Sequence, residues 1–418
     1  MRKTKSGASA VAPTPSPAIA LGGEGERSKG RCRHFGDCGG CQLQDKPYEE
    51  QLALKASRVT ELLKLAGWTG PLPIHRSPDE WYYRNKMEFS FQDVFPAPAL
   101  GQDYLLLGLK RKGRWDKVMN LAECHLLSPE APKLLEAVHA WALHENLEPY
   151  NLHRQTGFLR HLVVREAKNT PDRMVLLVTN PGSLPEPSFV EAVRSAYPAT
   201  SILWGVNTKS ADVARTDKVR KLYGEEQITE ELLGRRFRIS PYSFFQTNTR
   251  GAGALYGLLR GWLAELKPKH VLDLYCGSGA ISLCVADLCE RVLGVEIVES
   301  AVLDARHNAQ ANKVGNAEFM AAKTEELLPI LAAQNLDVDL IVTDPPRSGM
   351  HPDATRALRD LGAPHLIYVS CNPKALVADL LRLKDYYSLE KVECVDLFPH
   401  TDHVETVALL RSNIVPPA

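Results

Sequence analysis

A cysteine followed by Asn and Pro, in the segment Tyr368-Val-Ser-Cys371-Asn-Pro373, is the residue of this 418-residue sequence best suited to act as a nucleophile. The apolar run Leu366–Val369 predicts a buried strand, so Cys371 stands at the carboxyl end of that strand. In an open α/β sheet this end faces the ligand-binding crevice. Free cysteines are most often small buried apolar residues, and Cys371 on its own has the same interpretation. The other motifs along the chain therefore decide whether Cys371 is a nucleophile or a buried apolar residue.

A thiolate can prepare a pyrimidine ring for substitution at carbon 5. Carbon 5 of uracil is a poor nucleophile, but thiolate addition to carbon 6 makes it an enolate-like centre that can take a methyl group. The adduct must then lose its carbon-5 proton to a base before the cysteine leaves. Glu405, in a β-prone segment near the sheet's edge, is the favoured base because partial desolvation would raise its pKa. His403 is the alternative base.

A Gly-rich turn could hold the methyl donor. The segment Val271–Gly279 runs from a predicted strand into this turn, and a helix is expected over Ile281–Leu288. Glycines let the backbone approach a ligand closely, although any doubly wound sheet can carry such a turn. Asp273 before the turn and Glu296 at the end of the next strand suit the amino-acid tail and the ribose of S-adenosylmethionine (SAM).

A second acidic segment, Asp344-Pro-Pro-Arg347, follows the predicted strand Leu340–Thr343. In many methyltransferases that act on amino groups, an aromatic residue follows the proline pair and stacks on the extruded base. Arg347 stands at that position here. The substitution argues against methylation of an exocyclic nitrogen.

These residues need a scaffold, and the alternation of short apolar strands with helices from about residue 240 onward predicts one. It indicates an α/β, Rossmann-like methyltransferase domain with a parallel sheet and helices on both faces. The rest of the chain is expected to contribute an N-terminal iron–sulfur segment and a β-rich central RNA-binding domain. The expected boundaries are a disordered tail at 1–30, the cysteine segment and a helix (47–65) at 31–75, the central domain at 76–240 and the methyltransferase domain at 241–418. Within the central domain we expect strands at 86–91, 104–109 and 174–179 and a helix at 131–146.

Composition excludes a membrane-spanning protein and a uniformly basic nucleic-acid binder. Lys and Arg total 50, as do Asp and Glu, so an RNA surface must be a local patch. No apolar run approaches the roughly 20 residues that span a bilayer. Nine cysteines without an export signal indicate reduced thiols, and a cytoplasmic location is expected. The basic residues near Met1 leave a transit peptide as an alternative.

Cys32, Cys38 and Cys41 place three thiols within ten residues, and Cys124 is the candidate for a distant fourth ligand. Thiolates without other ligands suit zinc or an iron–sulfur cluster. Zinc ribbons use paired C-x2-C units, and only one such unit is present here. The three-plus-one arrangement favours a [4Fe–4S] cluster, with zinc or unligated thiols as the alternatives.

Two segments mix cations with aromatic residues, as single-stranded RNA sites do. Lys110–Lys117 carries five cations and one Trp, and Trp81–Lys86 carries three aromatic residues and two cations. A solvated hairpin loop is the alternative for the first segment, and core packing is the alternative for the aromatic residues of the second.

Five motifs, taken in order, resemble those of the RNA uracil-5 methyltransferases, in particular the iron–sulfur type that acts on 23S rRNA. They are Pro241–Asn248, Asp273–Gly279, Asp344–Arg347, Ser370–Pro373 and His403–Thr406, and with the cysteines the resemblance covers about 32–410. Two departures are Ala280, where members often have Asn, and the tail in place of the β-barrel domain with which many relatives begin. RNA binding is therefore expected of the central domain.

The resemblance implies a role for each matching residue. Cys371 would be the nucleophile and Glu405 the proton acceptor. SAM would contact Gln246, Tyr275, Glu296 and Asp344, and a [4Fe–4S] cluster would be held by Cys32, Cys38, Cys41 and Cys124. The implied partner is RNA, 23S rRNA first and tRNA as the alternative, with a monomeric protein expected. An RNA cytosine-5 methyltransferase is a rival interpretation, and an RNA-binding protein with a degenerate methyltransferase fold is another.

Overall fold

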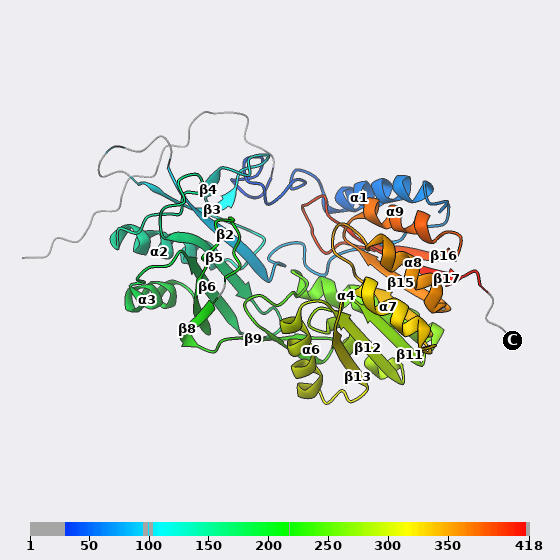
Figure 1. The fold of residues 1–418 in the computed structure, drawn as a ribbon. Coiled ribbons are helices and arrows are strands. Elements are labelled where there is room, and N and C mark those ends of the chain that lie inside the picture. Colours follow the sequence, from blue (N-terminus) through cyan, green and yellow to red (C-terminus); the bar gives the residue numbers. More distant parts are fainter. Residues whose placement is uncertain (1–29, 95–98, 100–102, 217, 415–418) are drawn as a thin grey trace, which may run out of the picture.

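The computed structural model describes residues 30–94, 99, 103–216 and 218–414 of the chain. The tail expected at 1–30 lies outside the described residues, except for Gly30. Figure 1 shows two sheet-containing halves, the central sheet around β2–β8 on the left and the sheet around β11–β17 on the right.

One sheet of the described chain has eight strands in the order β1-β16-β17-β15-β14-β11-β12-β13. Its strands are β1 (Ile74–His75), β11 (His270–Leu274), β12 (Arg291–Glu296), β13 (Ala317–Ala321), β14 (Leu340–Thr343), β15 (His365–Ser370), β16 (Tyr387–Val395) and β17 (Glu405–Ser412). The four strands expected in this region, at 271–274, 292–296, 340–343 and 366–369, are confirmed.

The sheet is mixed, so the prediction of a parallel sheet is wrong for its last strands. The pairs from β13 through β12, β11 and β14 to β15 are parallel, but β17 lies antiparallel between β15 and β16. Residues 396–404 connect β16 to β17 without a crossover helix, and so short a connection joins antiparallel strands. Because β17 runs in the opposite direction, its first residue, Glu405, lies at the edge where β15 ends.

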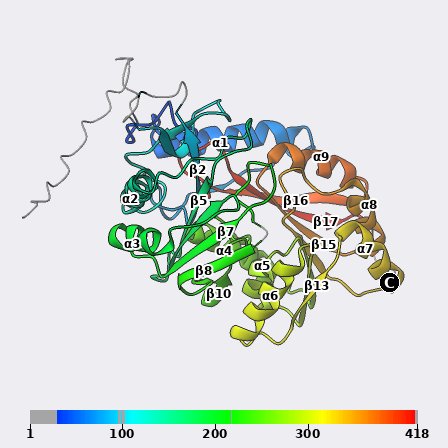
Figure 2. The ribbon, with the colours of Figure 1, turned by 60° about the vertical axis from the view of Figure 1, so that its left-hand side comes forward.

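Helices cover both faces of this sheet. Along β15, Ile367 and Val369 enter the core shared with α4, α5 and α6, whereas Leu366 and Tyr368 enter the core shared with α1, α7, α8 and α9. Helices α1 and α9 lie side by side in both views (Figures 1 and 2). The helices are α1 (Tyr48–Lys64), α4 (Thr249–Leu266), α5 (Ala280–Val285) with a 3-10 turn at Ala286–Leu288, α6 (Glu299–Ala311), α7 (Thr324–Ala333), α8 (Pro352–Leu361) and α9 (Pro373–Leu383).

The central sheet has the strand order β4-β3-β2-β5-β6-β7-β8 and is antiparallel except where β6 pairs with β7. That parallel pair is joined by a crossover helix, α3. Its strands and helices are β2 (Lys86–Asp93), β3 (Leu105–Lys110), β4 (Val118–Asn120), α2 (Ala131–His144), β5 (Leu159–Glu166), β6 (Arg173–Thr179), α3 (Glu186–Ala196), β7 (Ser201–Val206) and β8 (Lys218–Gly224). The strands and the helix expected in this region are confirmed.

The two sheets share buried surface. On β5, Leu162 and Val164 face α2 and α3, while Val163 belongs to the same core as Leu255 of α4. The hairpin β9 (Ile228–Leu232) and β10 (Arg235–Ile239) adds to this second core. The described helices include none that is both long and apolar enough to cross a membrane.

Candidate active site

Five of the residues singled out in the sequence meet at one edge of the eight-stranded sheet. The strand order across this edge is β17, β15, β14, β11 and β12. In that order the edge presents Glu405 at the start of β17, Cys371 after β15, Asp344 after β14, Tyr275 after β11 and Glu296 at the end of β12. The crevice at the carboxyl ends of parallel strands is the usual ligand site of such sheets.

Local sequence fixes Cys371 between a strand and a helix. Asn372 caps α9, because its side chain accepts a hydrogen bond from the Lys374 backbone N–H, and Pro373 suits the first helical position. The same Asn372 side-chain amide donates to the Arg347 carbonyl at 2.9 Å. The cysteine is therefore held between the loops that follow β14 and β15. The β15–β17 register pairs Ser370 with Thr406, so the next positions bring Cys371 opposite Glu405.

The charges around the Cys371 thiol oppose one another. Burial raises the pKa of Cys371 to about 11, and the Glu405 and Asp344 carboxylates add to the increase. The guanidinium of Arg347 lowers the pKa of the same thiol. In this crevice Arg347 is therefore the cation that favours the thiolate form.

Glu405 is only 2% exposed. Burial, with a smaller contribution from Asp344, raises its pKa to about 8. The increase expected from the sequence is confirmed, but its cause is the position of β17 inside the sheet, between two other strands. His403 is half-buried, and burial together with Arg347 and Arg84 lowers its pKa.

Two more carboxyl groups lie behind Glu405. Burial raises the pKa of Asp344 to about 7, and Gln246 donates a hydrogen bond to its Oδ2 atom at 3.2 Å. Burial also raises the pKa of Asp273 to about 7. Tyr256 of α4 is buried, and burial, with smaller contributions from all three carboxyl groups, raises the pKa of its hydroxyl well above the usual value.

The Gly-rich turn fits SAM. Asp273 accepts hydrogen bonds from the Ser282 backbone and hydroxyl through one oxygen, while its other oxygen is buried without a partner among the described residues. Tyr275 and Gly277 both have positive φ, 62° and 55°, which exposes the backbone of the turn. Glu296 accepts from the Gly277 N–H at 3.2 Å. An orphaned carboxylate oxygen and a glycine-lined turn suit the cationic amine and the backbone contacts of SAM.

Cavities of about 440 and 450 Å³ flank this turn, the first lined by Tyr275 and Pro346 and the second by Gly277 and Glu296. Gln246, expected from the sequence to contact SAM, is largely buried in the loop before α4 and reaches the same crevice through Asp344. Ala280 begins α5 and offers no polar side chain there.

The four predicted cluster cysteines come together at the junction of the N-terminal segment and the central sheet. Cys124 raises the pKa of Cys32, Cys38 and Cys41, each of which is raised mainly by burial. Arg84 lowers the pKa of two of these thiols, and its buried Nε has no hydrogen-bond partner among the described residues. Within that part of the chain no three Cys, His, Asp or Glu side chains converge on a site for one metal ion.

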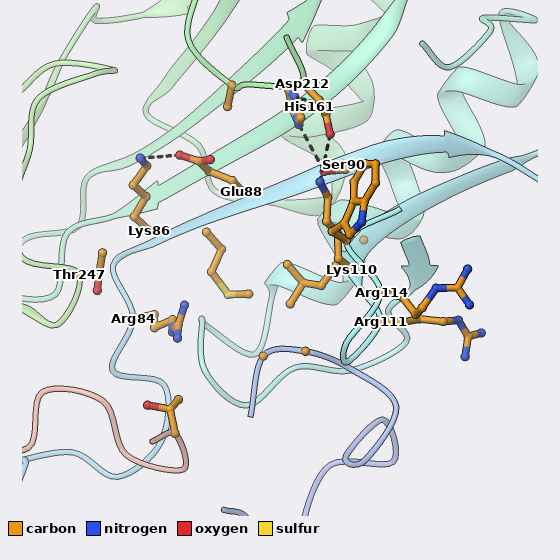
Figure 3. Close-up of a pocket in the computed structure, with 18 of the residues that line it drawn as sticks. Arg84, Lys86, Glu88, Ser90, Lys110, Arg111, Arg114, His161, Asp212 and Thr247 are labelled. Atoms are coloured by element: carbon orange, nitrogen blue, oxygen red, sulfur yellow. Dashed lines mark hydrogen bonds and ion pairs between the residues drawn. The ribbon is translucent and has the colours of Figure 1, made fainter. Parts of the chain in front are cut away.

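A basic cavity of about 880 Å³ lies between the loop before β17, the cysteine segment and the central sheet. Its lining includes His403 and Thr401 from the loop before β17, and Gly39 and Gly40 from the cysteine segment. Figure 3 shows cationic side chains reaching into it from β2 and from the β3–β4 connection. The lining holds five cations and two carboxylates: Arg84, Lys86, Lys110, Arg111, Arg114, Glu88 and Asp212.

The two segments that were candidates for RNA contact differ in how far their aromatic rings are exposed. Trp115, in the first segment, is 69% exposed at the rim of this cavity. In the second segment, Tyr83 is buried and Trp81 stacks on His400, so those aromatic rings pack within the protein. Only Arg84 and Lys86 of that segment line the cavity.

Sequence reasoning missed three features of the site. The charge of Arg347 near Cys371 and the position of Tyr256 depend on loops and helices that meet only in the fold. The third feature is a buried ion pair between Lys55 and Asp396. A signal for it was present, because Lys55 falls on the same helical face as the apolar Leu52 and Val59.

The fold and the crevice define a SAM-dependent methyltransferase, and comparisons with known proteins identify the family. The family model described as tRNA (Uracil-5-)-methyltransferase matches residues 210–413. A Clostridium tetani protein described as an uncharacterized RNA methyltransferase is 40% identical over 388 residues, with 91% of this chain and 83% of that protein covered. A Chlorobaculum tepidum protein with the same description is 35% identical over 397 residues, with 90% and 82% covered.

Among solved structures, the Pyrococcus abyssi tRNA (uracil-54, C5)-methyltransferase in complex with S-adenosyl-L-homocysteine superposes with a TM-score of 0.74. It is 30% identical, and the match covers 89% of this chain and 85% of that one. The chain therefore belongs to the RNA uracil-5-methyltransferase family and is a SAM-dependent RNA methyltransferase. The family assignment made from the motifs is confirmed.

Proposed function

We propose that this enzyme methylates carbon 5 of a uridine in RNA through a covalent adduct between Cys371 and carbon 6 of the base. The observation that carries the proposal is the proximity of Cys371, directly after β15, to Glu405, at the start of the adjacent strand β17, beside a crevice that fits SAM. A nucleophile and a buried base at one edge are what carbon-5 methylation requires and nitrogen methylation does not.

The proposed reaction has three steps. The Cys371 thiolate adds to carbon 6, and the electron pair of the carbon 5–carbon 6 double bond moves toward carbon 5 and the carbon-4 oxygen. SAM supplies an electrophilic methyl group, which carbon 5 takes. Glu405 then removes the carbon-5 proton, the double bond re-forms and the thiolate leaves. The products are 5-methyluridine, S-adenosylhomocysteine and one proton.

The charges of the crevice act differently on the two groups. Burial, Glu405 and Asp344 hold the pKa of Cys371 at about 11, and Arg347 opposes them by favouring the thiolate needed for attack. The raised pKa of Glu405, about 8, makes its carboxylate a stronger base than an exposed Glu. His403 has a lowered pKa and lines the basic cavity, so we assign it to the RNA side of the site.

We propose that RNA enters through the basic cavity and that unpaired nucleotides beside the target lie against the central sheet. Lys86, Lys110 and Arg114 would contact phosphates, and the exposed ring of Trp115 would stack on a base. The target must leave its stack because its ring is approached by the thiol and the methyl group together.

For the cysteine segment we propose a [4Fe–4S] cluster held by Cys32, Cys38, Cys41 and Cys124. Cys124 lies near enough to the other three thiols to raise their pKa values, which supports a shared site, and the neighbouring Arg84 would offset the cluster's negative charge. Iron and acid-labile sulfide in equal amounts support the cluster, whereas zinc without iron refutes it.

The RNA substrate is proposed to be 23S rRNA, as the motif set suggests. tRNA is the second candidate because the Pyrococcus abyssi protein that this chain resembles is a tRNA methyltransferase. Tritiated-methyl transfer from SAM to purified 23S rRNA and to bulk tRNA, followed by mapping of 5-methyluridine, decides between them.

The mechanism is tested by Cys371→Ala, which should abolish 5-methyluridine formation while SAM still binds. Cys289→Ala is the matched control, because this half-buried cysteine packs elsewhere, against the end of α5. Normal turnover by Cys371→Ala would refute the covalent route. Glu405→Gln should trap an RNA–protein adduct that survives denaturing gels, and its absence would transfer the role of base to His403.

A further inference from the structure

The loop of residues 396–404, which leads directly into Glu405, has irregular backbone in a mostly buried position. Buried carbonyl groups need hydrogen-bond donors, and a loop cannot supply them through its own regular ladder. Here the donors come from elements more than a hundred residues away in the sequence. The loop is therefore held from outside.

One face of α1 supplies two of these donors, from Lys55 and Arg58, and two further side chains that contact the loop. Tyr48, Gln51, Lys55 and Arg58 recur at spacings of three or four residues, which places them along one side of the helix. All four contact the 396–404 loop.

The contacts centre on a buried ion pair. The Lys55 ammonium donates to Asp396 Oδ1 at 2.7 Å and to the Phe398 carbonyl at 3.0 Å, and the two charged side chains are 1% and 0% exposed. The Tyr48 hydroxyl donates to the other Asp396 oxygen at 3.0 Å. The Phe398 N–H closes the loop back onto Asp396 at 3.0 Å.

His400, at the tip of the loop, is fixed from three sides. Gln51 accepts from its backbone N–H at 2.8 Å and contacts ring Nδ1 at 3.1 Å. The Trp81 ring stacks on the imidazole with 3.6 Å between centroids. The backbone φ of His400, 66°, lies in the left-handed region, which a non-glycine residue keeps only where its surroundings enforce it.

The remaining donors complete the restraint. Tyr83 donates to the Pro399 carbonyl at 3.0 Å, and the Arg58 guanidinium donates to the Asp402 carbonyl, next to His403. The backbone N–H groups of Gln42 and Leu43, just after Cys41, donate to the His400 carbonyl at 2.8 and 3.0 Å.

We propose that this face of α1, with the Lys55–Asp396 pair at its centre, is a positioning device that aims Glu405 and His403 at the target base. The proposal rests on the proposed function, because it assigns the loop a task only if Glu405 removes the carbon-5 proton. Tyr48, Gln51, Lys55 and Arg58 are positioning residues, since they act through the loop and do not line the cavity at which RNA is proposed to bind.

The order of steps gives the device a distinct signature. Glu405, the proton acceptor, acts after methyl transfer, so a loosened loop slows release of the adduct and leaves attack and SAM binding intact. A displacement of the Glu405 carboxylate by about 1 Å costs up to roughly a hundredfold in rate. We therefore expect Arg58→Met and Lys55→Met to lower kcat about ten- to hundredfold and to lower KM for RNA with it, so that kcat/KM changes little. Both variants should accumulate RNA–protein adduct.

Two variants guard against simple misfolding. Arg58 is exposed, so Arg58→Met removes its contact without disturbing the core, and Arg58→Lys should restore part of the rate. Lys55→Met combined with Asp396→Asn removes both charges if the single change fails to fold. Lys64→Met is the matched control, because Lys64 is exposed on the same helix and pairs with Glu61 of that helix.

Denaturing gels on labelled RNA, with Glu405→Gln as the reference, separate the outcomes. Adduct in Glu405→Gln, Arg58→Met and Lys55→Met but not in Lys64→Met supports the device. Adduct in Glu405→Gln alone, with Arg58→Met folded and turning over normally, overturns it. Absence of adduct in Glu405→Gln itself overturns the assignment of Glu405 as the base, on which the device rests, whereas the proposed function as a whole is tested separately by Cys371→Ala.

Discussion

Replacing Glu405 by Gln is expected to stabilise the protein at alkaline pH and to have little effect at acid pH. Burial raises the folded-state pKa of Glu405 to about 8, against an ordinary value of 4.5. The folded protein therefore holds a proton between those pH values that the unfolded chain releases. Stability from this group is fully present below about 4.5 and is lost as the pH rises through the folded-state pKa of about 8.

The size of the effect follows from the shift. A difference of about 3.5 pKa units at about 1.4 kcal/mol per unit gives an upper limit of about 5 kcal/mol. Local relaxation and water entry reduce such penalties, so a gain of about 2–5 kcal/mol is expected for Glu405→Gln at pH 9. The neutral amide has no charged form to desolvate, which is why the gain disappears in acid.

Urea unfolding of the parent protein and of Glu405→Gln at pH 5 and pH 9 measures this difference. The control is Glu390→Gln, an exposed carboxylate on the neighbouring strand β16, for which the difference should stay flat. If Glu405→Gln and the parent lose stability in parallel between pH 5 and pH 9, the burial argument is wrong. If the parent protein gains more stability than Glu405→Gln between pH 5 and pH 9, the sign of the predicted effect is wrong.

Other substitutions test separate parts of the site. Arg347→Met removes the cation that lowers the Cys371 pKa, so the pH midpoint of iodoacetamide alkylation should rise, and an unmoved midpoint would show that Arg347 does not act on the thiol. Asn372→Ala removes the α9 cap, and we expect the free energy of unfolding to fall by about 1 kcal/mol in thermal or urea titrations, a loss that Asn372→Ser should largely recover. Lys86→Met with Lys110→Met should weaken RNA binding and flatten its salt dependence without changing SAM affinity, whereas an unchanged salt slope would place the RNA elsewhere.

The strands that build the crevice were predictable because buried parallel strands are continuous apolar runs. Leu340–Thr343 and Leu366–Val369 have that form, and acidic or nucleophilic residues follow directly. The start of α9 was equally readable, because Asn372 and Pro373 are a cap and a first-turn residue. Local chemistry of this kind does not depend on distant parts of the chain.

Strand pairing was not predictable in the same way. No pattern in the sequence from Glu405 to Ser412 indicates that this strand lies antiparallel between β15 and β16. That insertion buries Glu405 and brings it opposite Cys371, so the property that makes it a strong base is a product of topology. A period-2 or apolar pattern indicates a strand and one of its faces but does not identify its neighbours.

Mixed aromatic and cationic segments were ambiguous for a related reason. Trp81 and Trp115 both stand beside cations in the sequence, yet one stacks on His400 and the other is exposed at the basic cavity. An aromatic ring gains free energy from burial in protein as readily as from stacking on a base. Whether such a ring is buried or exposed depends on residues far away in the sequence, here the loop before β17 that carries His400.

The Lys55–Asp396 pair and the carboxyl groups of the crevice belong to one energetic argument. Glu405 and Asp273 are buried and Asp344 is partly buried, at a cost that their raised pKa values record. Glu405 directly follows the loop of residues 396–404, so a loop free to move would admit water to Glu405, relieve that cost and lower its basicity. A buried ion pair adds little net stability, but separating its partners is strongly destabilising because a buried charge is left unpaired. The Lys55–Asp396 pair therefore resists displacement of the loop. The restraint from α1 therefore preserves the desolvation on which the proposed proton transfer depends.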